Sequence, residues 1–459
     1  MAVHPSSETF PLELRAIGNF RRRIAGELIL RGEPGYEEAR QHWNAQVDRY
    51  PGFIVRPRDA GDIATAIAFA RAFDLPLAVR SGGHNGAGLA LCDDGVVVDL
   101  SRFDAVTLDP TRRIARAQPG ATNGKFVSAA AAHGLATTTG NAAGVGLGGL
   151  TLGGGIGWLM GKHGLTIDNV RSFQIVTADG QLRTASASEH PELFWALRGG
   201  GGNFGIVTEI EYQLHPLERV LAGRVVIPLA DARAGLQALR ALDLAAPDEL
   251  TTMARLVTPP RIGPALVVDV CYSGDDLAAG ERLLAPLRAS GLPAADSVAP
   301  MAYANLYAEA EPMPVGLRFS GVTTTLPVLS DGAVEALLVA AASRPTPFAT
   351  IMLQRLHGAA SRVATEATAF ALRAPQYFLT ATAAWQSGPA EPQLAWAGGV
   401  KELLRPYAGS GSYVNFLGRG EPHEVRDAYG PNLARLAAIK ARYDPENIFR
   451  LNQNIPPQR

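Results

Sequence analysis

The stretch Gly140-Asn-Ala-Ala-Gly-Val-Gly-Leu-Gly-Gly-Leu-Thr-Leu-Gly-Gly-Gly-Ile-Gly157 carries nine glycines in eighteen positions. An ordinary helix or strand does not tolerate that density, because each glycine in a regular element costs roughly 0.5–1 kcal/mol relative to alanine. Glycine permits close backbone approach and positive φ, and a large planar or phosphorylated ligand lying against main-chain N–H groups would use both. A flexible linker would be polar, whereas apolar residues such as Val145, Leu147 and Ile156 run through this stretch. We therefore predict that residues 140–157 bind a ligand.

Glycine is also in excess over the whole chain, and it gathers in two further places. The 459 residues include 49 glycines, where average usage would give about 32. One further cluster, Gly199–Gly205, precedes an alternating strand over Ile206–Tyr212. The other, Arg80–Gly88, follows a predicted strand and contains His84, whose glycine neighbours suggest a backbone shaped around a ligand with the imidazole pointed at it.

Composition and charge exclude several classes of protein. A chain with 47% hydrophobic and 19% charged residues is long enough for two domains with full cores, so disorder is excluded. The formal net charge of −1 lacks the basic footprint of a nucleic-acid binder. No run of 18 apolar residues and no signal-peptide pattern occurs, so we expect a cytoplasmic protein with neither membrane nor nucleic acid as partner.

Cysteine and histidine spacing gives no metal or redox centre. Cys92 and Cys271 are too far apart for a CxxC pair, and two cysteines cannot build a zinc site or a disulfide framework. No pair of histidines has metal-ligand spacing, so we expect no metal.

Two matches to GxGxxG, at Gly144–Gly149 and Gly200–Gly205, lack the context of a nicotinamide-binding Rossmann fold. No buried strand precedes the first, and the second leads into a strand where the Rossmann motif opens a helix. GxSxG, HExxH and GxxxxGK[ST] are absent, so serine hydrolases, zincins and P-loop enzymes have no support.

The order of predicted elements is that of an α+β protein. A strand over Phe53–Pro57, a helix over Ala60–Phe73 and strands over Leu77–Arg80 and Val96–Leu100 follow one another without regular βα alternation.

The glycine clusters end near Pro216, and a different pattern begins there. Strands such as Ala265–Tyr272 and Phe348–Arg355 alternate with amphipathic helices such as Asp276–Ser290 and Asp331–Ala342. A last helix, Pro431–Tyr443, and an extended tail close the chain. We expect domains over residues 1–218 and 219–408, with residues 409–459 returning to the first.

Four segments carry a resemblance to a known family: Arg80–Gly88, Gly140–Asn169, Phe194–Gly205 and Tyr443–Asn447. In this order they resemble the berberine bridge enzyme-like flavoproteins, and most closely the bacterial, 6-hydroxy-D-nicotine oxidase-like branch of that family. The resemblance covers nearly the whole chain and is specific for fold and cofactor rather than for substrate.

The resemblance implies a two-subdomain FAD-binding module of the PCMH or vanillyl-alcohol-oxidase type, with a substrate domain whose antiparallel sheet, covered by helices, roofs the flavin ring. It implies an 8α-histidyl bond from His84 to the flavin. The cofactor-binding residues implied are Arg80, Ser81, Gly82, Gly83, His84, Asn85, Gly88, Pro119, Gly120, Gly140, Gly144, Val145, Gly148, Gly149, Gly153, Gly154, Gly155, Ile206, Val207, Tyr413, Asn415 and Asn452.

Two departures from the family pattern change the expected chemistry. Ala142 stands where bicovalent relatives have a cysteine bonded to the flavin, so a single covalent link is expected. Phe416 ends the motif Tyr413-Val-Asn-Phe416, where many relatives have a tyrosine that serves as base. The usual base is therefore absent.

The resemblance also implies hydride transfer from a C–H beside a hydroxyl or amine of a small molecule, followed by reoxidation with O2 to hydrogen peroxide. Val145 occupies the position that gates oxygen in relatives, which favours an oxidase. The candidate catalytic groups facing the ring, each of which could instead be structural, are Gln354, Arg355, His357, Tyr377, Tyr303 and Tyr307.

Other functions remain open from sequence alone. They are an oxygenating flavoenzyme of natural-product biosynthesis, a flavin dehydrogenase with another acceptor, and a flavin-binding protein without turnover. Substrate identity and oligomeric state carry no motif.

Overall fold

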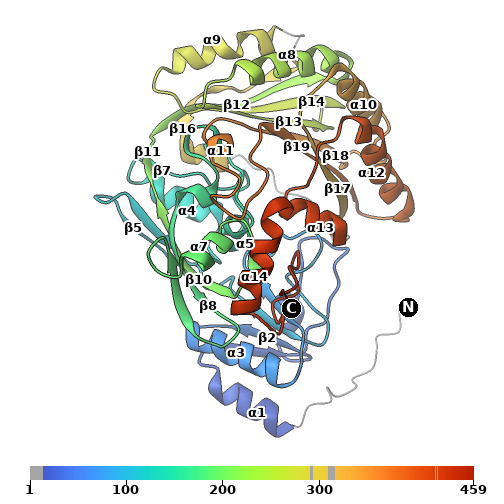
Figure 1. Cartoon of the computed structure of the whole chain (residues 1–459). Coiled ribbons are helices and arrows are strands. Elements are labelled where there is room, and N and C mark those ends of the chain that lie inside the picture. Colours follow the sequence, from blue (N-terminus) through green and yellow to red (C-terminus); the bar gives the residue numbers. More distant parts are fainter. Residues whose placement is uncertain (1–13, 290–292, 309–315, 419, 421, 459) are drawn as a thin grey trace.

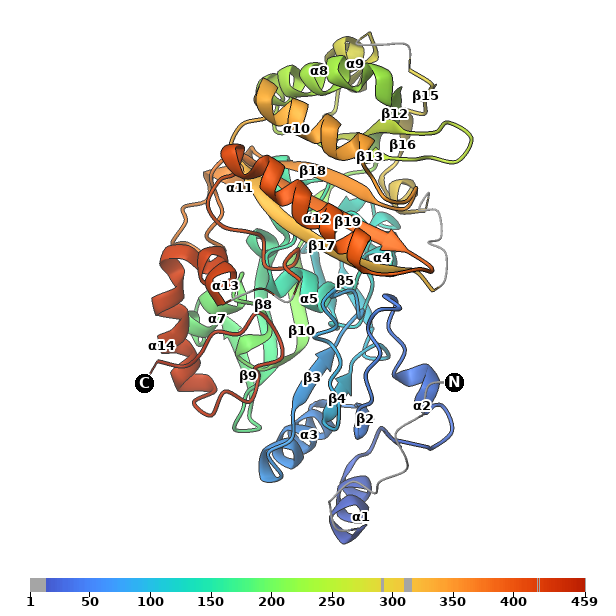
Figure 2. The same cartoon turned by 90° about the vertical axis from the view of Figure 1, so that its right-hand side faces the viewer.

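The computed structural model describes residues 14–289, 293–308, 316–418, 420 and 422–458. A large sheet with its helices forms one part of the molecule, and smaller sheets form the other part (Figures 1 and 2). Helices and strands are mixed without regular βα alternation, which confirms the predicted α+β class. No helix in these residue ranges is long and apolar enough to cross a membrane.

The first sheet is built from the N-terminal strands and has the order β1-β2-β4-β3. Its strands are β1 (Glu27–Leu30), β2 (Phe53–Arg56), β3 (Leu77–Arg80) and β4 (Val96–Asp99). Helix α3 (Ala60–Ala72) begins at Asp59, whose side chain accepts hydrogen bonds from two backbone N–H groups of the first turn. It packs on helix α1 (Leu14–Arg23), where Phe20 stacks on Phe69 at 3.9 Å between ring centroids. The carboxyl end of β3 leads directly into the loop that carries His84.

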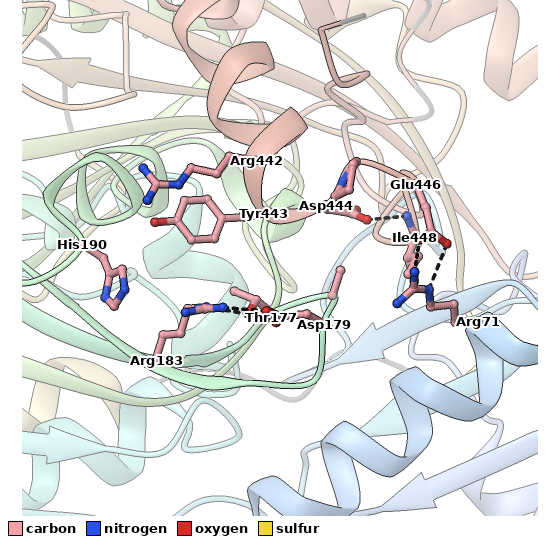
Figure 3. A pocket seen from close by; sticks show the side chains of 12 residues that line it. Arg71, Thr177, Asp179, Arg183, His190, Arg442, Tyr443, Asp444, Glu446 and Ile448 are labelled. Carbon is pink, nitrogen blue, oxygen red and sulfur yellow. Dashed lines mark hydrogen bonds and ion pairs between the residues drawn. The ribbon is translucent and has the colours of Figure 1, made fainter.

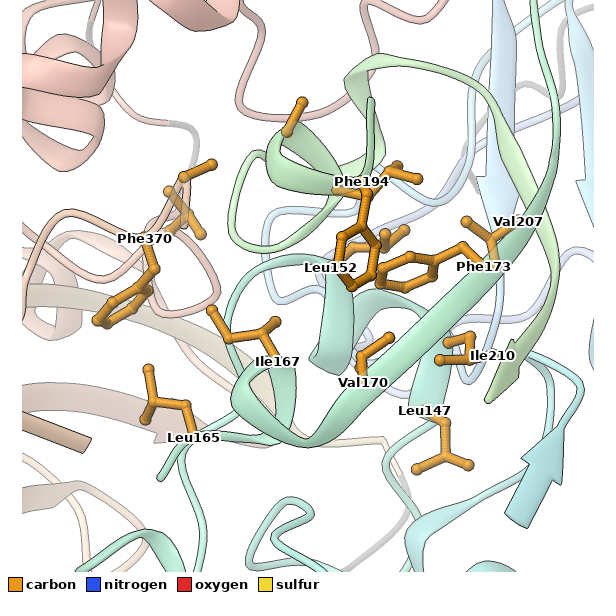
Figure 4. Close-up of a cluster of buried hydrophobic side chains, with 14 of the residues drawn as sticks. Leu147, Leu152, Leu165, Ile167, Val170, Phe173, Phe194, Val207, Ile210 and Phe370 are labelled. Carbon is orange, nitrogen blue, oxygen red and sulfur yellow. The ribbon is translucent and has the colours of Figure 1, made fainter. Parts of the chain in front are cut away.

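The second sheet is antiparallel and has the order β5-β6-β10-β8-β9. Its strands are β5 (Val106–Asp109), β6 (Ile114–Ala117), β8 (Val170–Val176), β9 (Leu182–Ser186) and β10 (Ile206–Gln213). Helices α4 (Asn123–Ala131) and α7 (Pro191–Leu197) lie against it, and β7 (Leu135–Ala136) pairs with β11 (His215–Pro216). Its core gathers Leu147, Phe173, Phe194 and Ile210 around the glycine-rich stretch (Figure 4).

The third sheet has eight antiparallel strands, all of them within residues 219–385. The strands are β12 (Arg219–Pro228), β13 (Leu250–Val257), β14 (Ala265–Tyr272), β15 (Ala295–Asp296), β16 (Ala299–Ala302), β17 (Arg318–Leu326), β18 (Thr350–Leu356) and β19 (Gln376–Trp385). Four helices cover the face turned away from the other sheets: α8 (Ala232–Ala245), α9 (Leu277–Arg288), α10 (Asp331–Ala342) and α12 (Glu391–Leu404) (Figure 2). The opposite face of this sheet therefore looks toward the glycine-rich loops.

The glycine-rich stretch contains one regular element that its composition argued against. Residues Leu147–Leu152 form the short helix α5, with Gly148 and Gly149 inside it. Burial of Leu147 and Leu152 in the core offsets the cost of the two glycines. Tertiary packing therefore outweighs local propensity here.

The C-terminal segment returns to the glycine loops through helices α13 (Pro422–Tyr429) and α14 (Leu433–Tyr443). Asn203 in the Gly199–Gly205 loop donates from Nδ2 to Gln453 O at 3.1 Å and accepts at Oδ1 from Ile455 N at 2.9 Å. Lys440 lies wholly buried beneath this junction, and its Nζ donates to Asp444 Oδ2 (2.6 Å), Asn203 O (2.7 Å) and Phe449 O (2.9 Å). One ammonium group thus ties the tail to the loop.

The Asp444→Asn variant is expected to lose about 3–5 kcal/mol of unfolding free energy, because it leaves the buried Lys440 ammonium without its counter-charge. Urea or thermal unfolding of the flavin-loaded protein measures this loss. The matched control is Glu192→Gln, which breaks the exposed pair with Arg435 and should cost at most about 1 kcal/mol. Equal losses in the two variants would contradict the buried role of Asp444.

Candidate functional site

A cavity of about 520 Å³ lies where the glycine-rich loops, the third sheet and the C-terminal tail meet. Its lining comprises Trp43, Pro119, Tyr429, Met352 and Gln354 of β18, and parts of residues 77–100, 140–156, 201–207, 413–416 and 449–453. Segments more than three hundred positions apart in the sequence thus share one wall. This cavity unites all three glycine clusters that the sequence singles out.

The loop after β3 and the glycine-rich stretch meet backbone against backbone. A Cβ placed on Gly82 would lie 2.7 Å from Gly146 Cα, and one placed on Gly146 would lie 2.7 Å from Gly82 Cα. On the other side of the stretch, a Cβ on Gly148 would lie 2.7 Å from Pro119 Cβ. No side chain fits at these three positions, so glycine is required for the two loops to form one continuous surface.

His84 lies on the wall of the cavity beside Trp43, which also lines it. The two rings stack with centroids 5.8 Å apart. Asn44 fixes this arrangement, because its Nδ2 donates to Gly86 O and Phe319 O, and its Oδ1 accepts from Phe319 N. Desolvation by the surrounding protein lowers the pKa of His84, so the imidazole is neutral and nucleophilic at neutral pH.

The glycines after α5 serve the packing of the C-terminal segment. A Cβ on Gly153 would overlap the side-chain amide of Asn415, and Gly155, with φ of 81°, donates from its N–H to the Tyr413 hydroxyl at 2.9 Å. Asn415 Nδ2 donates to the same hydroxyl at 2.8 Å and to Leu150 O at 3.1 Å. Tyr413 and Asn415 thereby fix the glycine-rich stretch to the C-terminal segment.

An amide pair closes the cavity under the third sheet. Asn141 Nδ2 donates to Gln354 Oε1 at 2.9 Å and also lies 3.6 Å from Met253 Sδ. Gln354 is only 1% exposed, and both its Nε2 and Asn141 Oδ1 are buried without a partner. Buried polar atoms of native proteins are nearly always paired, and these two atoms are exceptions to that rule.

Fifteen of the predicted cofactor-binding residues line the cavity. They are Ser81, Gly82, Gly83, His84, Asn85, Pro119, Gly140, Val145, Gly148, Gly149, Ile206, Val207, Tyr413, Asn415 and Asn452. The other seven are not among the lining residues. Arg80 donates to Ala39 O at 2.8 Å, Gly88 packs on Val47, Gly120 on Leu100 and Gly144 beside His84. Gly153 and Gly154 pack on the C-terminal segment, and Gly155 packs on Thr166 and donates to the Tyr413 hydroxyl.

Of the predicted catalytic residues, the structure brings only Gln354 to the cavity. Arg355 is the next residue on β18, so its side chain projects from the opposite, helix-covered face, where its cross-strand neighbour Tyr377 packs in the core. Tyr377 there contacts the buried carboxyl of Asp243, and burial raises the pKa of Asp243 to about 6. Successive side chains of a strand point to opposite faces of the sheet, so Gln354 and Arg355 cannot both face the cavity.

The remaining three candidates are also packed away from the cavity. Tyr303 and Tyr307 are buried in a small core, joined by a 3.0 Å hydrogen bond between their hydroxyls, and Tyr307 pairs with Thr139 at 3.1 Å. His357 packs on Gly161, and burial lowers the pKa of His357 to about 4.

Several lining residues escape sequence reasoning. Trp43, Asn141, Met352 and Phe449 line the cavity but belong to no motif with a mechanism of its own. The sequence could have suggested Asn141 as a lining residue, because it lies inside the glycine-rich stretch. It could also have suggested Met352, because Met352 and Gln354 are two positions apart and so share a strand face.

A second cavity, of about 260 Å³, lies between the β8–β9 hairpin and the end of α14 (Figure 3). Four of its charged groups form two ion pairs, Arg71 with Glu446 and Arg183 with Asp179, and Arg442 lies over the ring of Tyr443. None of the predicted site residues lines it. It is therefore a hollow bordered by two ion pairs and separate from the predicted site.

The large cavity fits an extended ligand with a ring system and phosphates. A Cβ on Gly149 or Gly202 would meet no atom within 4 Å, so at these two positions bare backbone faces open space. Asn452 Oδ1 is buried without a partner in the same wall. Such a glycine cradle can offer main-chain donors to phosphates without a basic patch.

The Gly146→Ala variant is expected to lose about 2 kcal/mol or more of unfolding free energy, because the new Cβ collides with the backbone of Gly82. Thermal unfolding measures this. Gly399→Ala in α12 is the control, because nothing lies within 4 Å of its Cβ and alanine should stabilise that helix by roughly 0.5–1 kcal/mol. A Gly146→Ala protein as stable as the parent would contradict the backbone contact.

Comparisons with known proteins agree with this geometry. An FAD binding domain model matches residues 51–186, and a berberine and berberine-like model matches residues 412–456. (R)-6-Hydroxynicotine oxidase of Paenarthrobacter nicotinovorans is 34% identical, over 95% of this chain and 97% of that protein. The crystal structure of 6-hydroxy-D-nicotine oxidase from Arthrobacter nicotinovorans superposes with a TM-score of 0.84 at 30% identity, over 95% of this chain and 98% of that one.

Glucooligosaccharide oxidase from Acremonium strictum, with its 6-S-cysteinyl, 8α-N1-histidyl FAD, superposes with a TM-score of 0.84 at 25% identity, over 96% of this chain and 99% of that one. The likeness therefore extends from end to end in each case. It confirms the family resemblance, and the FAD binding domain match supports the FAD cofactor that the resemblance implies. The chain belongs to the berberine bridge enzyme-like family of FAD-linked oxidoreductases.

Proposed function

We propose that the protein is an oxidase that takes hydride from a C–H beside an amine or hydroxyl of a small molecule and delivers the electrons to O2, giving hydrogen peroxide. The observation that carries this proposal is the single cavity in which the glycine cradle, His84 and strand β18 meet. When bound, FAD supplies the hydride acceptor and the reaction with oxygen.

The cofactor would be held along the whole length of the cavity. Backbone at Gly82, Gly83, Gly148 and Gly149 would receive the ring and the diphosphate, and Ile206 with Val207 would contact the adenosine end. The seven predicted residues that do not line the cavity would hold these loops in place rather than touch the cofactor.

His84 would carry the flavin through a single covalent bond at the 8α position. Its lowered pKa keeps a ring nitrogen unprotonated, as an attacking nucleophile must be. Ala142 lines the same cavity and has no nucleophilic atom, so a second bond of the cysteinyl kind found in glucooligosaccharide oxidase has no partner here.

The cavity favours an amine as the group beside the reacting C–H. Phe416 lines it in place of a tyrosine, and none of its lining residues, all within the described part of the chain, is Asp, Glu, Lys or Arg. Of the two lining tyrosines, Tyr413 is wholly buried and its pKa is raised to about 12. An alcohol would need a base for its O–H proton, whereas a neutral amine releases hydride without one.

Val145 also lines the cavity, as expected of an oxygen gate in an oxidase. For this reason we propose O2, rather than another molecule, as the electron acceptor.

The covalent bond is tested by denaturing the protein in acid. The parent precipitate should remain yellow, and the His84→Ala precipitate should release its flavin to the supernatant. His133→Ala serves as a control and should keep the colour, because His133 does not line the cavity. A colourless precipitate from the parent protein would rule out the tether.

The reaction itself is tested with an anaerobic panel of small amines and alcohols. Loss of flavin absorbance followed by peroxide on admission of air is expected with at least one amine, and turnover should rise with pH as the ammonium form loses its proton. Reduction by dithionite but by no compound of the panel would count against the proposal, and labelled oxygen appearing in the product would indicate an oxygenase instead.

A further inference from the structure

We propose that the second cavity, of about 260 Å³, binds a phosphate group, either as the free ion or as part of a small phosphorylated molecule. This cavity shares no lining residue with the large cavity assigned to FAD. The site therefore goes beyond the proposed function and does not depend on it.

The hydroxyl of Tyr443 is the group that points to a ligand. Tyr443 is only 8% exposed, yet its hydroxyl forms no hydrogen bond with any residue that the structure describes. It is not one of the polar atoms that the protein seals off from the outside. Figure 3 shows the hydroxyl turned into the cavity, toward the end where Arg442, His190 and Arg183 lie. A bound molecule can therefore accept a hydrogen bond from it.

Arg442 adds a positive charge without a counter-charge. Its guanidinium carbon lies 5.4 Å from the centroid of the Tyr443 ring, and within the described part of the chain it forms no ion pair. It comes from the last turn of α14, one position before Tyr443. A guanidinium group beside an unused hydroxyl donor suits an anion, because hydrogen bonds to an ionised acceptor are stronger than neutral ones.

The negative charges of the cavity wall are already matched, so the wall offers no free carboxylate to a cation. It contains three carboxylates, and each has a basic partner within ion-pair distance. The pairs are Asp179 with Arg183, Glu446 with Arg71, and Asp444 with Lys440.

Two further groups favour phosphate over an anion with fewer oxygens. Arg183 donates from Nη2 to Asp179 and from Nε to Thr177, and its Nη1 has no partner among the described residues. The Nδ1 of His190 lies 2.8 Å from Thr184 O and must donate, since a carbonyl only accepts, so Nε2 is left over. That nitrogen can accept the proton of a P–OH group. A tetrahedral group with several oxygens can meet all of these positions, whereas a carboxylate has only two oxygens.

The cavity has room for more than the ion alone. A water molecule occupies about 30 Å³ in the liquid, so about 260 Å³ holds several molecules of that size. The first carbon atoms of a phosphorylated molecule therefore fit beside the phosphate group.

The test is isothermal titration calorimetry of the flavin-loaded protein in chloride buffer at constant ionic strength. The probes are inorganic phosphate and glycerol 3-phosphate, with glycerol as the uncharged comparison. At least one phosphate should bind with a dissociation constant of about 1 mM or tighter, and glycerol should not bind. Tighter binding of glycerol 3-phosphate would assign the site to a phosphorylated molecule, and any other order would assign it to the free ion.

Three variants make the assignment specific. Tyr443→Phe removes only the hydroxyl and should weaken binding about tenfold at unchanged thermal stability, because the hydroxyl bonds to nothing in the described protein. Arg442→Gln should weaken binding by at least about tenfold as well. Arg112→Gln changes an exposed arginine outside both cavities and should bind phosphate as the parent does.

The site is overturned if neither phosphate binds at tens of millimolar, if binding survives in both Tyr443→Phe and Arg442→Gln, or if Arg112→Gln loses as much affinity as they do. The last result would indicate attraction to surface charge in general. Because calorimetry requires no turnover, an inactive protein that binds phosphate would contradict only the proposed function, and an active oxidase that binds none would contradict only this site.

Discussion

The site depends on the approach of two backbones, at Gly82 and Gly146. Each glycine occupies the space that a Cβ on the other would need. This contact joins the loop that carries His84, which follows a parallel strand of the first sheet, to a stretch that packs on the antiparallel second sheet. Without the contact between Gly82 and Gly146, the two walls of the cofactor cavity would separate. His84 and Val145 would then no longer face the same ligand.

The C-terminal segment completes what the two loops begin. Asn203, Lys440 and Asp444 satisfy the backbone polar groups of the Gly199–Gly205 loop and of the tail with buried hydrogen bonds. Desolvation lowers the pKa of Lys440, and the Asp444 carboxylate opposes that effect. Burying a charge is costly unless it is paired in this way, so the tail and the loop form one cooperative unit. Tyr413 and Asn415 likewise join the C-terminal segment to the glycine-rich stretch through hydrogen bonds to Gly155 N and Leu150 O.

The third sheet reaches the cavity through one face of one strand, β18. Gln354 reaches the cavity, while Arg355 and Tyr377 stabilise the helix-covered side together with Asp243. Only every second residue of a strand faces the cavity, so about half of the polar residues on a strand can be candidates for the site.

The sequence by itself determined the α+β class, because strand alternation and helical periodicity are local signals, and its glycine clusters indicated a ligand-binding backbone. FAD followed from the resemblance of the motifs to a known family, and the family-model match supports it. The sequence also located the elements closely, as with the predicted strand over Leu77–Arg80 and the helix over Asp331–Ala342. The domain boundary near residue 218 and the roles of individual site residues stay predictions. Only the tertiary structure decided which side of β18 faces the cavity, and that Asn141 meets Gln354 across 213 positions. The reason is physical: a one-residue change of register inverts every side chain of a strand, and that register is set by contacts between distant segments.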